Sequence, residues 1–452
     1  MIAHRLFIPA LLLPLLALTA TAQVPEGEPT LSGEMTLSQC ITYAQRHSPD
    51  LIPARVQMEQ LEVQEESARM NFLPDLNAGM GQNFSFGYTQ GHDKVLRKNN
   101  GSSTGLSVST SLSLFEGGAR WWALKSSQEA LESKDYILDE VEDRIALTVA
   151  SSYVGVLLAQ QIVEVAEENL SLSLMQQKRV DAQVEAGKLA PSEQLKMRTQ
   201  VGQDRLALNE AKSDLDRAMR VLRLDMGITE EGETFTVPQE DPESVIARLE
   251  RESPYRAAPE WTNPSLRLAQ LRYDLSSYDV KRAKAGYMPR LSLSGGYSNG
   301  YFHYFGNEIP NQSFGDQLRS NGQYTIGLSL SIPIFNRGQV RASVRQAELQ
   351  RESALGQLIQ QQFSEQRNIT LATADLRKAE ESYRLSKDNV EVAQESLDMT
   401  EKEYNAGRIT AYEWEQSKNK LIGAKSQYLQ SVYTRLLRSI NLTYYLTGTL
   451  PR

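Results

Sequence analysis

The chain has 452 residues, with 48 basic and 56 acidic side chains and a formal net charge of −8. This acidic balance argues against a nucleic-acid partner, because nothing supplies a dominant basic surface. We find no run of about 18 apolar residues beyond residue 22, which excludes a bundle of membrane-spanning helices. A single cysteine, Cys40, and four scattered histidines argue against a metal site, a cofactor site or a histidine-based catalytic site, and we expect none.

Residues 1–22 have the pattern of a secretory signal peptide. A short basic start precedes an apolar segment over residues 6–18, and Ala-Thr-Ala at residues 20–22 fits a cleavage site. We therefore expect an exported protein whose mature chain begins at Gln23, with an uncleaved anchor as the alternative. Lipidation is not expected, since a lipoprotein needs a cysteine directly after the cleavage site and Cys40 lies far downstream.

The rest of the chain contains an internal repeat, which decides the architecture before any local pattern does. Four short segments recur in the same order, the first two 215 residues later and the last two 220 residues later. They pair Ser48-Pro49-Asp50-Leu51 with Asn263-Pro264-Ser265-Leu266, Pro74-Asp75-Leu76 with Pro289-Arg290-Leu291, Phe115-Glu116-Gly117-Gly118 with Phe335-Asn336-Arg337-Gly338, and Ala186-Gly187-Lys188 with Ala406-Gly407-Arg408.

We expect a first repeat over 23–227, an inter-repeat equatorial insert over 228–260, and a second repeat over 261–452. Each repeat should run helix, β-hairpin, long helix and returning helix. In the first repeat we expect the β-hairpin at about 76–115, the long helix at about 119–186 and the returning helix at about 191–227. In the second repeat we expect the β-hairpin at about 291–335, the long helix at about 338–405 and the returning helix at about 409–447. A single helix over 119–186 would be about 100 Å long, so it must project or pair with other helices.

The long helices carry a heptad pattern. Apolar or small residues from Leu376 to Tyr404 alternate in spacings of three and four, and the same pattern recurs from Val156 to Val184. This spacing predicts coiled coils. We interpret the charged faces between these positions as solvated surface.

The expected strands alternate strictly. In residues 106–114 nearly every even position is apolar and every odd position is serine, and residues 326–332 repeat the scheme. The alternation fits either an antiparallel sheet on a soluble core or a membrane barrel with its apolar face outward. Strands of about 9–11 residues and a Ser/Gly polar face favour the barrel. Aromatic residues also gather at the strand ends: Phe84, Phe86, Tyr88, Tyr297, Tyr301, Phe302, Tyr304 and Phe305.

The strand count requires several chains. Two hairpins give four strands, which cannot close a barrel, and open sheet edges are not tolerated in lipid. Two chains would give about eight strands with a filled interior, and three would give about twelve with room for water.

These features together resemble the TolC family of outer-membrane efflux and secretion channels. The resemblance covers about residues 36–450. It rests on the repeated Asn/Ser-Pro-x-Leu, Pro-x-Leu and Phe-x-x-Gly elements and on the turn Tyr404-x-x-Gly407-x-x-Thr410. It implies a mixed α+β membrane protein: a homotrimer with a 12-stranded β-barrel, four strands per protomer, continued by a helical coiled-coil barrel in the periplasm.

The resemblance also implies a function. The protein would be the passive exit channel of a tripartite efflux system in the cell outer membrane, with outer-membrane lipid, a periplasmic adaptor (membrane fusion) protein and an inner-membrane transporter as partners. We favour small-molecule cargo. The alternatives are a type I protein secretion system and a metal-efflux system. In none of these is the chain an enzyme.

The family docks its adaptor at the periplasmic turns between helices. The matching positions here are Gly187, Lys188, Leu189 and Ala190, and Gly407, Arg408, Ile409 and Thr410. Each glycine can end a helix in the left-handed conformation, Pro191 suits the first turn of a helix, and Thr410 is a good N-cap. The same residues would be needed if they were helix caps alone.

The family often lines its pore constriction with two acidic residues after the second turn. The matching positions are Glu413 and Gln416, so one carboxylate ring of Glu413 is expected where two are usual. Such a ring would favour cations. Pairing of Glu413 with Arg408 at the surface is the alternative.

Two other classes of protein match parts of the sequence. Residues 296–300 fit the hydrolase pattern G-x-S-x-G at Ser298, with His303 nearby, but that motif needs a strand-to-helix elbow. A structural coiled-coil protein would explain the heptads, but it would not explain four alternating strands in register with the repeat.

Overall fold

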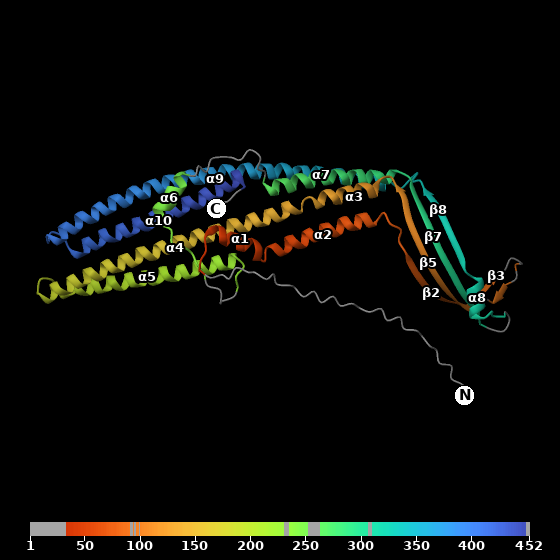
Figure 1. Ribbon diagram of the computed structural model, residues 1–452, viewed down its shortest axis with the longest axis horizontal. Coiled ribbons are helices and arrows are strands. Elements are labelled where there is room, and N and C mark those ends of the chain that lie inside the picture. Colours follow the sequence, from red (N-terminus) through yellow and green to blue (C-terminus); the bar gives the residue numbers. More distant parts are fainter. Residues whose placement is uncertain are drawn as a thin grey trace, which may run out of the picture.

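The computed structural model describes residues 33–448, apart from 91–93, 95, 99, 230–234, 252–262 and 306–309. The expected signal peptide lies outside the described residues. Long helices run side by side along most of the molecule, and a β-sheet bends away from one end of them (Figure 1). Both helical tips lie at the opposite end (Figure 1).

The elements follow the repeat. The first half contains α1 (Leu37–His47), α2 (Leu51–Met70), β2 (Asn77–Ser85), β5 (Gly101–Glu116), α3 (Ala119–Leu131), α4 (Lys134–Glu185) and α5 (Pro191–Asp225). The second half contains α7 (Pro264–Lys284), the 3-10 turn η1 (Ala285–Tyr287), β7 (Arg290–Tyr304), α8 (Phe314–Ser320), β8 (Gln323–Ser331), α9 (Gln339–Asn405) and α10 (Ala411–Thr447). Minor elements are β1 (Gly33–Glu34), β3 (Tyr88–Gln90), β4 (Leu96–Lys98), β6 (Phe235–Thr236) and α6 (Pro242–Arg251).

The structure corrects the expectation of one unbroken helix over 119–186. The helix is interrupted between Leu131 and Lys134, whereas α9 in the second repeat runs unbroken for 67 residues. The Ser133 hydroxyl donates to the Ala130 carbonyl at 2.5 Å. A serine side chain that competes for a backbone carbonyl in this way distorts a helix.

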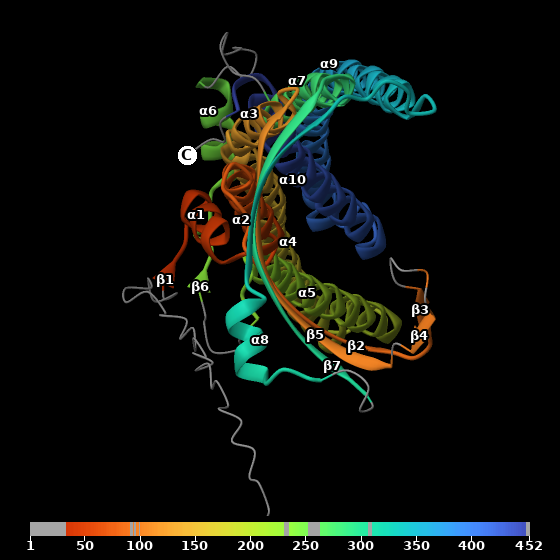
Figure 2. The same cartoon turned by 90° about the vertical axis from the view of Figure 1, so that its right-hand side faces the viewer.

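The four main strands form one antiparallel sheet in the order β2-β5-β7-β8. The two hairpins are joined through β5 and β7, so both repeats contribute to a single sheet. Seen along the long axis, the sheet follows an arc (Figure 2). The outer edges of β2 and β8 have no neighbouring strand within the described part of the chain.

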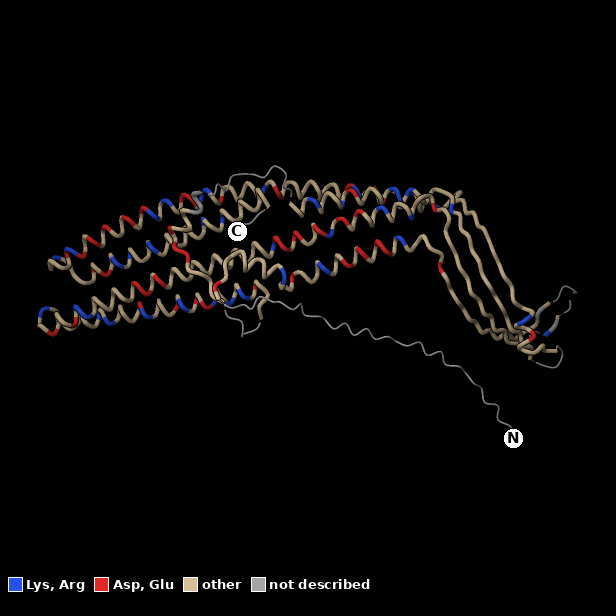
Figure 3. Tube along the Cα trace, viewed as in Figure 1, with Lys and Arg blue, Asp and Glu red and all other residues tan. Residues whose placement is uncertain are grey.

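The register gives the sheet two distinct faces. Met80, Leu106 and Val108 share one face with Leu293 and Leu328, because paired residues point to the same side. The opposite face is lined by small polar residues and glycine: Gly79, Ser107, Ser109, Ser111, Ser292, Ser294, Gly296, Gly327 and Ser329. Lys, Arg, Asp and Glu lie along the helices and are missing from the middle of the four strands (Figure 3).

Beyond the end of β8, side-chain amides replace a strand at the edge of β7. Gln317 of α8 accepts from the Phe302 N–H and donates to its carbonyl, both at 2.8 Å. Asn311 makes the same pair of bonds with the backbone of Tyr304, at 2.7 and 2.9 Å. These bonds satisfy backbone groups that the neighbouring strand no longer reaches.

The helices form two hairpins, α4–α5 and α9–α10, which lie together and reach the same end of the molecule (Figure 1). Their common core lies near mid-length, where Val149 and Tyr153 of α4 share a buried cluster with Val432 and Tyr433 of α10. Residues 235–251 of the inter-repeat segment pack on this core through Phe235, Val237, Val245 and Ile246.

One helical stretch contradicts the expectation that no long apolar run follows residue 22. A window within Ala119–Glu185 is long and apolar enough to cross a membrane by length and composition. Half of that window is buried inside the protein. Val149, Val156 and Leu157 belong to the common core, so their hydrophobicity is explained by helix packing.

Candidate functional site at the helical tips

The first tip joins α4 to α5 over residues 186–190. Gly187 takes the left-handed conformation, with φ of +71°. Its N–H donates to the Val184 carbonyl at 2.9 Å, and the Lys188 N–H donates to the Gln183 carbonyl at 2.8 Å. This pair of bonds is the Schellman motif, which satisfies the last carbonyls of a helix.

The second tip, between α9 and α10, has the same geometry. Gly407 has φ of +70°, its N–H donates to the Tyr404 carbonyl at 2.9 Å, and the Arg408 N–H donates to the Glu403 carbonyl at 2.9 Å. A Cβ at either glycine would meet nothing within 4 Å. The requirement for glycine therefore comes from the backbone conformation and not from crowding.

The tips present similar surfaces. Lys188 and Arg408 are exposed, while Leu189 and Ile409, which follow them, are half-buried. Ala190 and Thr410 are exposed and immediately precede the returning helices. Each tip therefore offers one basic side chain to solvent and anchors itself with one apolar side chain.

Glu413 has a defined local role. Its carboxylate accepts from the Thr410 N–H at 2.8 Å and from the Thr410 hydroxyl at 3.0 Å, and Thr410 Oγ1 accepts from the Glu413 N–H at 3.3 Å. This reciprocal arrangement is a capping box. The backbone hydrogen bond from Thr410 lowers the pKa of the exposed Glu413 carboxyl, so the residue is charged at neutral pH.

The alternative partner for Glu413 is not used, since no ion pair joins it to Arg408 among the described residues. Gln416 is exposed one turn further along α10, and its Nε2 donates to the Tyr412 hydroxyl at 2.9 Å. The structure thus places Glu413 and Gln416 together on an exposed side of α10 beside the second tip.

Sequence reasoning missed a buried polar cluster above the tips. Lys418 of α10 is completely buried and forms ion pairs with Asp204 of α5 at 3.3 Å and with Glu415 at 2.6 Å. Glu415, on the same helix, is also largely covered. The burial of Lys418 could have been inferred from its position in the sequence. It lies one turn from both Trp414 and Leu421, on the packed side of the helix.

The hydrolase motif does not have the required geometry. Ser298 lies inside β7, paired with Ser107 of β5 and Gln323 of β8. A nucleophile elbow needs a helix directly after the strand, whereas β7 continues to Tyr304. His303 lies near the end of the same strand, where the Tyr301 hydroxyl is 3.4 Å from its Nδ1.

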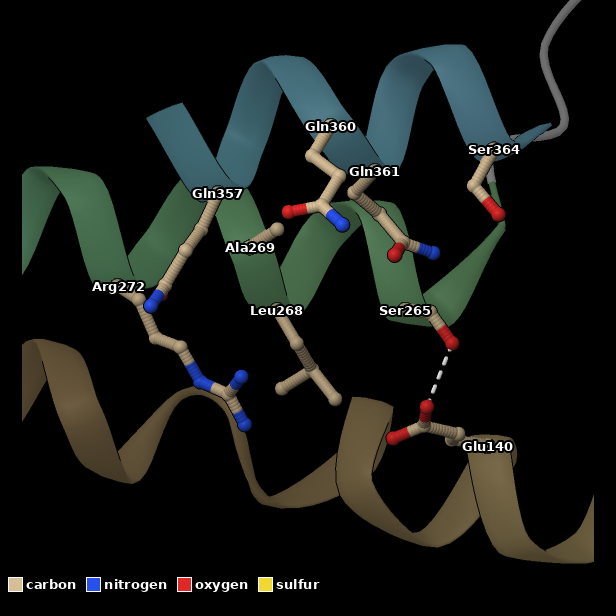
Figure 4. Close-up of a pocket in the computed structure, with 9 residues that line it drawn as sticks. All are labelled: Glu140, Ser265, Leu268, Ala269, Arg272, Gln357, Gln360, Gln361 and Ser364. Carbon is tan, nitrogen blue, oxygen red and sulfur yellow. Dashed lines mark hydrogen bonds between the residues drawn. The ribbon is translucent and has the colours of Figure 1, made fainter. Parts of the chain in front are cut away.

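A polar cavity of about 580 Å³ lies between α4, α7 and α9 (Figure 4). Ser265 donates to Glu140 at 2.5 Å across one end of it. The other side chains around the cavity are mainly amide and hydroxyl groups: Gln357, Gln360, Gln361 and Ser364, with Leu268, Ala269 and Arg272. Small-molecule sites are mostly apolar, and this cavity is mainly polar. We therefore do not choose the cavity as the candidate site and choose the tips.

Known proteins share both the sequence pattern and the fold. The family model described as outer membrane efflux protein matches residues 40–227 and 261–448. The outer membrane protein TolC of Salmonella enteritidis is 26% identical over 430 residues, covering 94% of this chain and 84% of that protein. The pyoverdine export outer membrane protein OpmQ of Pseudomonas aeruginosa is 25% identical over 442 residues, covering 92% and 86%.

Among solved structures, that of CusC superposes with a TM-score of 0.76 at 18% identity, covering 95% of this chain and 96% of that chain. Both halves of the chain match the family model, in agreement with the internal repeat. The resemblance inferred from the sequence is therefore confirmed. The chain belongs to the outer membrane efflux protein family, a TolC-like family of outer-membrane channels with a helical periplasmic extension.

Proposed function

We propose that the protein is the passive exit channel of a tripartite efflux system and that it works as a homotrimer with a closed 12-stranded barrel. The observation that carries this proposal is the open four-stranded sheet. Its two free edges, β2 and β8, are each nine residues long. Equal lengths allow β8 of one copy to pair along its whole length with β2 of the next, which leaves no edge in lipid.

The two faces of the sheet support a membrane location. One face carries exposed side chains such as Met80, Val108, Ile326 and Leu328, and the other carries serine and glycine. In a closed barrel the apolar face would meet lipid and the serine face would line a hydrated pore. Three copies supply a lumen wide enough for water, whereas two would be filled by side chains.

Four helices lie side by side in the order of their sequence, as the four strands do. The neighbours are α2–α3–α7–α9, so α2 and α9 flank the helical layer as β2 and β8 flank the sheet. Both outer helices expose apolar residues: Ile52, Val56, Val63 and Met70 on α2, and Leu349, Leu355, Ile359 and Phe363 on α9. Exposed apolar stripes mark an interface, and in the proposed trimer one neighbouring copy would cover α2 and the other would cover α9.

The tips are the proposed contact with a periplasmic adaptor protein, which in turn would link the channel to an inner-membrane transporter. The docking residues would be Gly187 to Ala190 and Gly407 to Thr410, with Lys188 and Arg408 as the exposed cations. Glu413 and Gln416 would line the narrow end of the pore. We infer that energy comes from the inner-membrane transporter, so the channel itself is passive.

Small molecules are the proposed cargo, in line with the similarity to the pyoverdine exporter OpmQ. Two relatives support the alternatives: the alkaline protease secretion protein AprF, 25% identical over 252 residues, and the cobalt-zinc-cadmium resistance protein CzcC, 22% identical over 445 residues. A strain that lacks this chain distinguishes them. Sensitivity to dyes and detergents indicates small-molecule export, sensitivity to zinc and cobalt indicates metal export, and a missing extracellular protein indicates secretion.

The docking proposal is tested by reversing the charge of both tips with Lys188→Glu and Arg408→Glu. We expect the variant to reach the outer membrane and conduct ions in planar bilayers, but to restore little dye efflux in the deletion strain. Arg345→Glu, on an exposed part of α9 near the strands, serves as the matched control and should restore efflux. Full efflux by the tip variant would contradict docking through these residues.

A further inference from the structure

The cations nearest the sheet are distributed unevenly between the two repeats. Residues 281–290 and 337–341, where α7 and α9 join the strands, contain six cations and no Asp or Glu: Lys281, Arg282, Lys284, Arg290, Arg337 and Arg341. The corresponding residues 66–75 and 117–121 of the first repeat contain two cations and two acids. In a chain with a formal net charge of −8, this excess of cations makes a local basic surface.

The two basic segments lie next to each other. A Cβ on Gly286, in the turn just after α7, would lie 3.1 Å from the side chain of Val340 in the first turn of α9. Figure 3 shows Lys and Arg residues where these two helices meet the sheet. Four exposed side chains form what we call the basic patch: Lys281, Lys284, Arg337 and Arg341.

The other two cations have different surroundings. Arg282 forms an ion pair with Asp279 at 3.0 Å, which balances its charge. Arg290 begins β7 and pairs with Ser331, so it points to the serine face of the sheet and not to the apolar face. We therefore leave both out of the basic patch.

The charges of the basic patch are not balanced by nearby carboxylates. Lys281 Nζ lies over the ring of Trp122, 4.3 Å from its centroid. In the part of the chain that the structure describes, Lys284, Arg337 and Arg341 form no ion pair. Exposed cations without a counter-charge attract an anionic partner.

The basic patch begins where the apolar face of the sheet ends. After the last residue of β8 come Ile332 and Ile334, which are 58% and 94% exposed, and Arg337 follows three residues later. On the other side of the patch, Tyr287 is exposed three residues after Lys284. In a membrane protein, aromatic residues and cations at the end of an apolar surface lie at the level of the lipid headgroups.

We propose that the basic patch binds the phosphate groups of anionic phospholipids in the periplasmic leaflet of the outer membrane. This inference rests on the proposed membrane location of the sheet. Arg337 and Arg341 can each bind two phosphate oxygens through the planar guanidinium group, whereas Lys281 and Lys284 supply point charges.

The apolar residues beside the patch favour a lipid over a free phosphate or an acidic protein. A phospholipid satisfies both surfaces at once, because its phosphate contacts the cations while its acyl chains cover Ile332 and Ile334. A free phosphate would leave these two isoleucines uncovered, and the same holds for a protein partner that binds through carboxylates alone.

The test compares two double variants of the full-length protein extracted in detergent. Lys284→Gln with Arg341→Gln removes two charges from the basic patch. Arg377→Gln with Lys387→Gln is the matched control, since it also removes one Lys and one Arg from exposed helical positions, but further along α9 from the sheet. The readout is the apparent affinity for phosphatidylglycerol and for phosphatidylcholine, measured by native mass spectrometry.

We expect the patch variant to bind phosphatidylglycerol about tenfold or more weakly than the wild type, because two of the four cations near the lipid phosphate are lost. The control variant should stay within about twofold of the wild type. Phosphatidylcholine has no net charge, so its affinity should be the same in all three proteins.

Three results would overturn the proposal. Equal affinity of the wild type and the patch variant for phosphatidylglycerol would show that the patch is not a lipid site. An equal loss of affinity for phosphatidylcholine would show that the lipid charge is not recognised. Displacement of phosphatidylglycerol by inorganic phosphate at the same concentration would show that the site takes free phosphate.

Failure of this inference is distinguishable from failure of the proposed function. If the wild-type protein forms no channels in planar bilayers, the proposed function fails whatever lipid the protein binds. If the wild type conducts and the patch variant binds phosphatidylglycerol as the control does, the function stands and only the lipid site is wrong.

Discussion

Gly187 and Gly407 end the two longest helical segments at the same point of each repeat, with almost identical φ angles of +71° and +70°. The sequence alone predicted both positions, because few residues other than glycine adopt this conformation readily.

We did not predict the burial of Lys418 from the sequence. A lysine on a charged helix is usually exposed, and only the approach of the other hairpin excludes water from this one.

At the second tip, Gly407→Ala should weaken the turn. Alanine in the left-handed conformation costs about 1 kcal/mol, so hydrogen exchange over residues 402–410 should be about fivefold faster. Gly423→Ala in α10 is the matched control, since that glycine is exposed, lies in a helix and has open space around its Cα. Its exchange should slow or stay unchanged. Equal acceleration in both variants would contradict the account of the tip.

Glu413→Gln should lower the preference of the channel for cations without disturbing the fold. Glutamine can also complete a capping box with Thr410, so the variant removes the charge and keeps the local hydrogen bonds. The measurement is the reversal potential of single channels in a salt gradient. Gln416→Glu should shift the potential in the opposite direction. A reversal potential that stays the same in both variants would remove this pair from the pore.

Asp143 should make stability depend on pH. Burial raises the pKa of this carboxyl to about 6, although it accepts a hydrogen bond from the Tyr444 hydroxyl at 3.0 Å. The pKa of this carboxyl is about 3.9 in the unfolded chain and higher in the folded protein. The contribution of Asp143 to the free energy of unfolding is therefore fully present below about pH 3.9 and is lost as the pH rises through about 6.

Asn at this position can still accept the Tyr444 hydrogen bond. We therefore expect Asp143→Asn to be more stable than the wild type by ~1 kcal/mol at pH 8, after allowance for partial exposure, and equally stable at pH 4. Thermal melting of the detergent-extracted protein measures the difference. Asp135→Asn, an exposed residue of the same helix, should follow the wild type. A constant difference at both pH values would contradict a raised pKa.

At the scale of elements, the alternation of residues 106–114 and 326–332 predicted strands that the structure contains in β5 and β8. The pairing of β5 with β7, which joins the two repeats into one sheet, was not predicted. Alternation specifies which face a residue occupies, but not which strand lies next to it. The break between α3 and α4 was also missed, because it depends on a local hydrogen bond of Ser133.

Two neighbouring residues of β8 test which face of the sheet meets lipid. Leu328 pairs with Leu293 on the apolar face, and Ser329 pairs with Ser292 on the opposite face. Arginine at Leu328 should cost about 2–4 kcal/mol in the middle of a bilayer and greatly reduce the amount of protein in the outer membrane. Ser329→Arg should insert normally and change the conductance. The reverse result would show that the assignment of the faces is wrong.

At the scale of the whole molecule, the repeat and the family were predicted from the sequence, and the family model confirms both halves. The proposed number of chains in the channel rests on a physical argument instead. The curved sheet ends at β2 and β8, and the helical layer ends at α2 and α9. The same two sides of the protomer could therefore contact neighbouring copies. We propose that two further copies complete this curved wall of four strands into a barrel with a hydrated lumen.

The most direct test of this account is the native mass of the protein extracted from the outer membrane in mild detergent, corrected for the bound detergent. We predict a mass of three chains, which would supply twelve strands and leave no free edge. A folded, stable monomer would contradict the account, since four strands with two open edges cannot form a channel through the membrane.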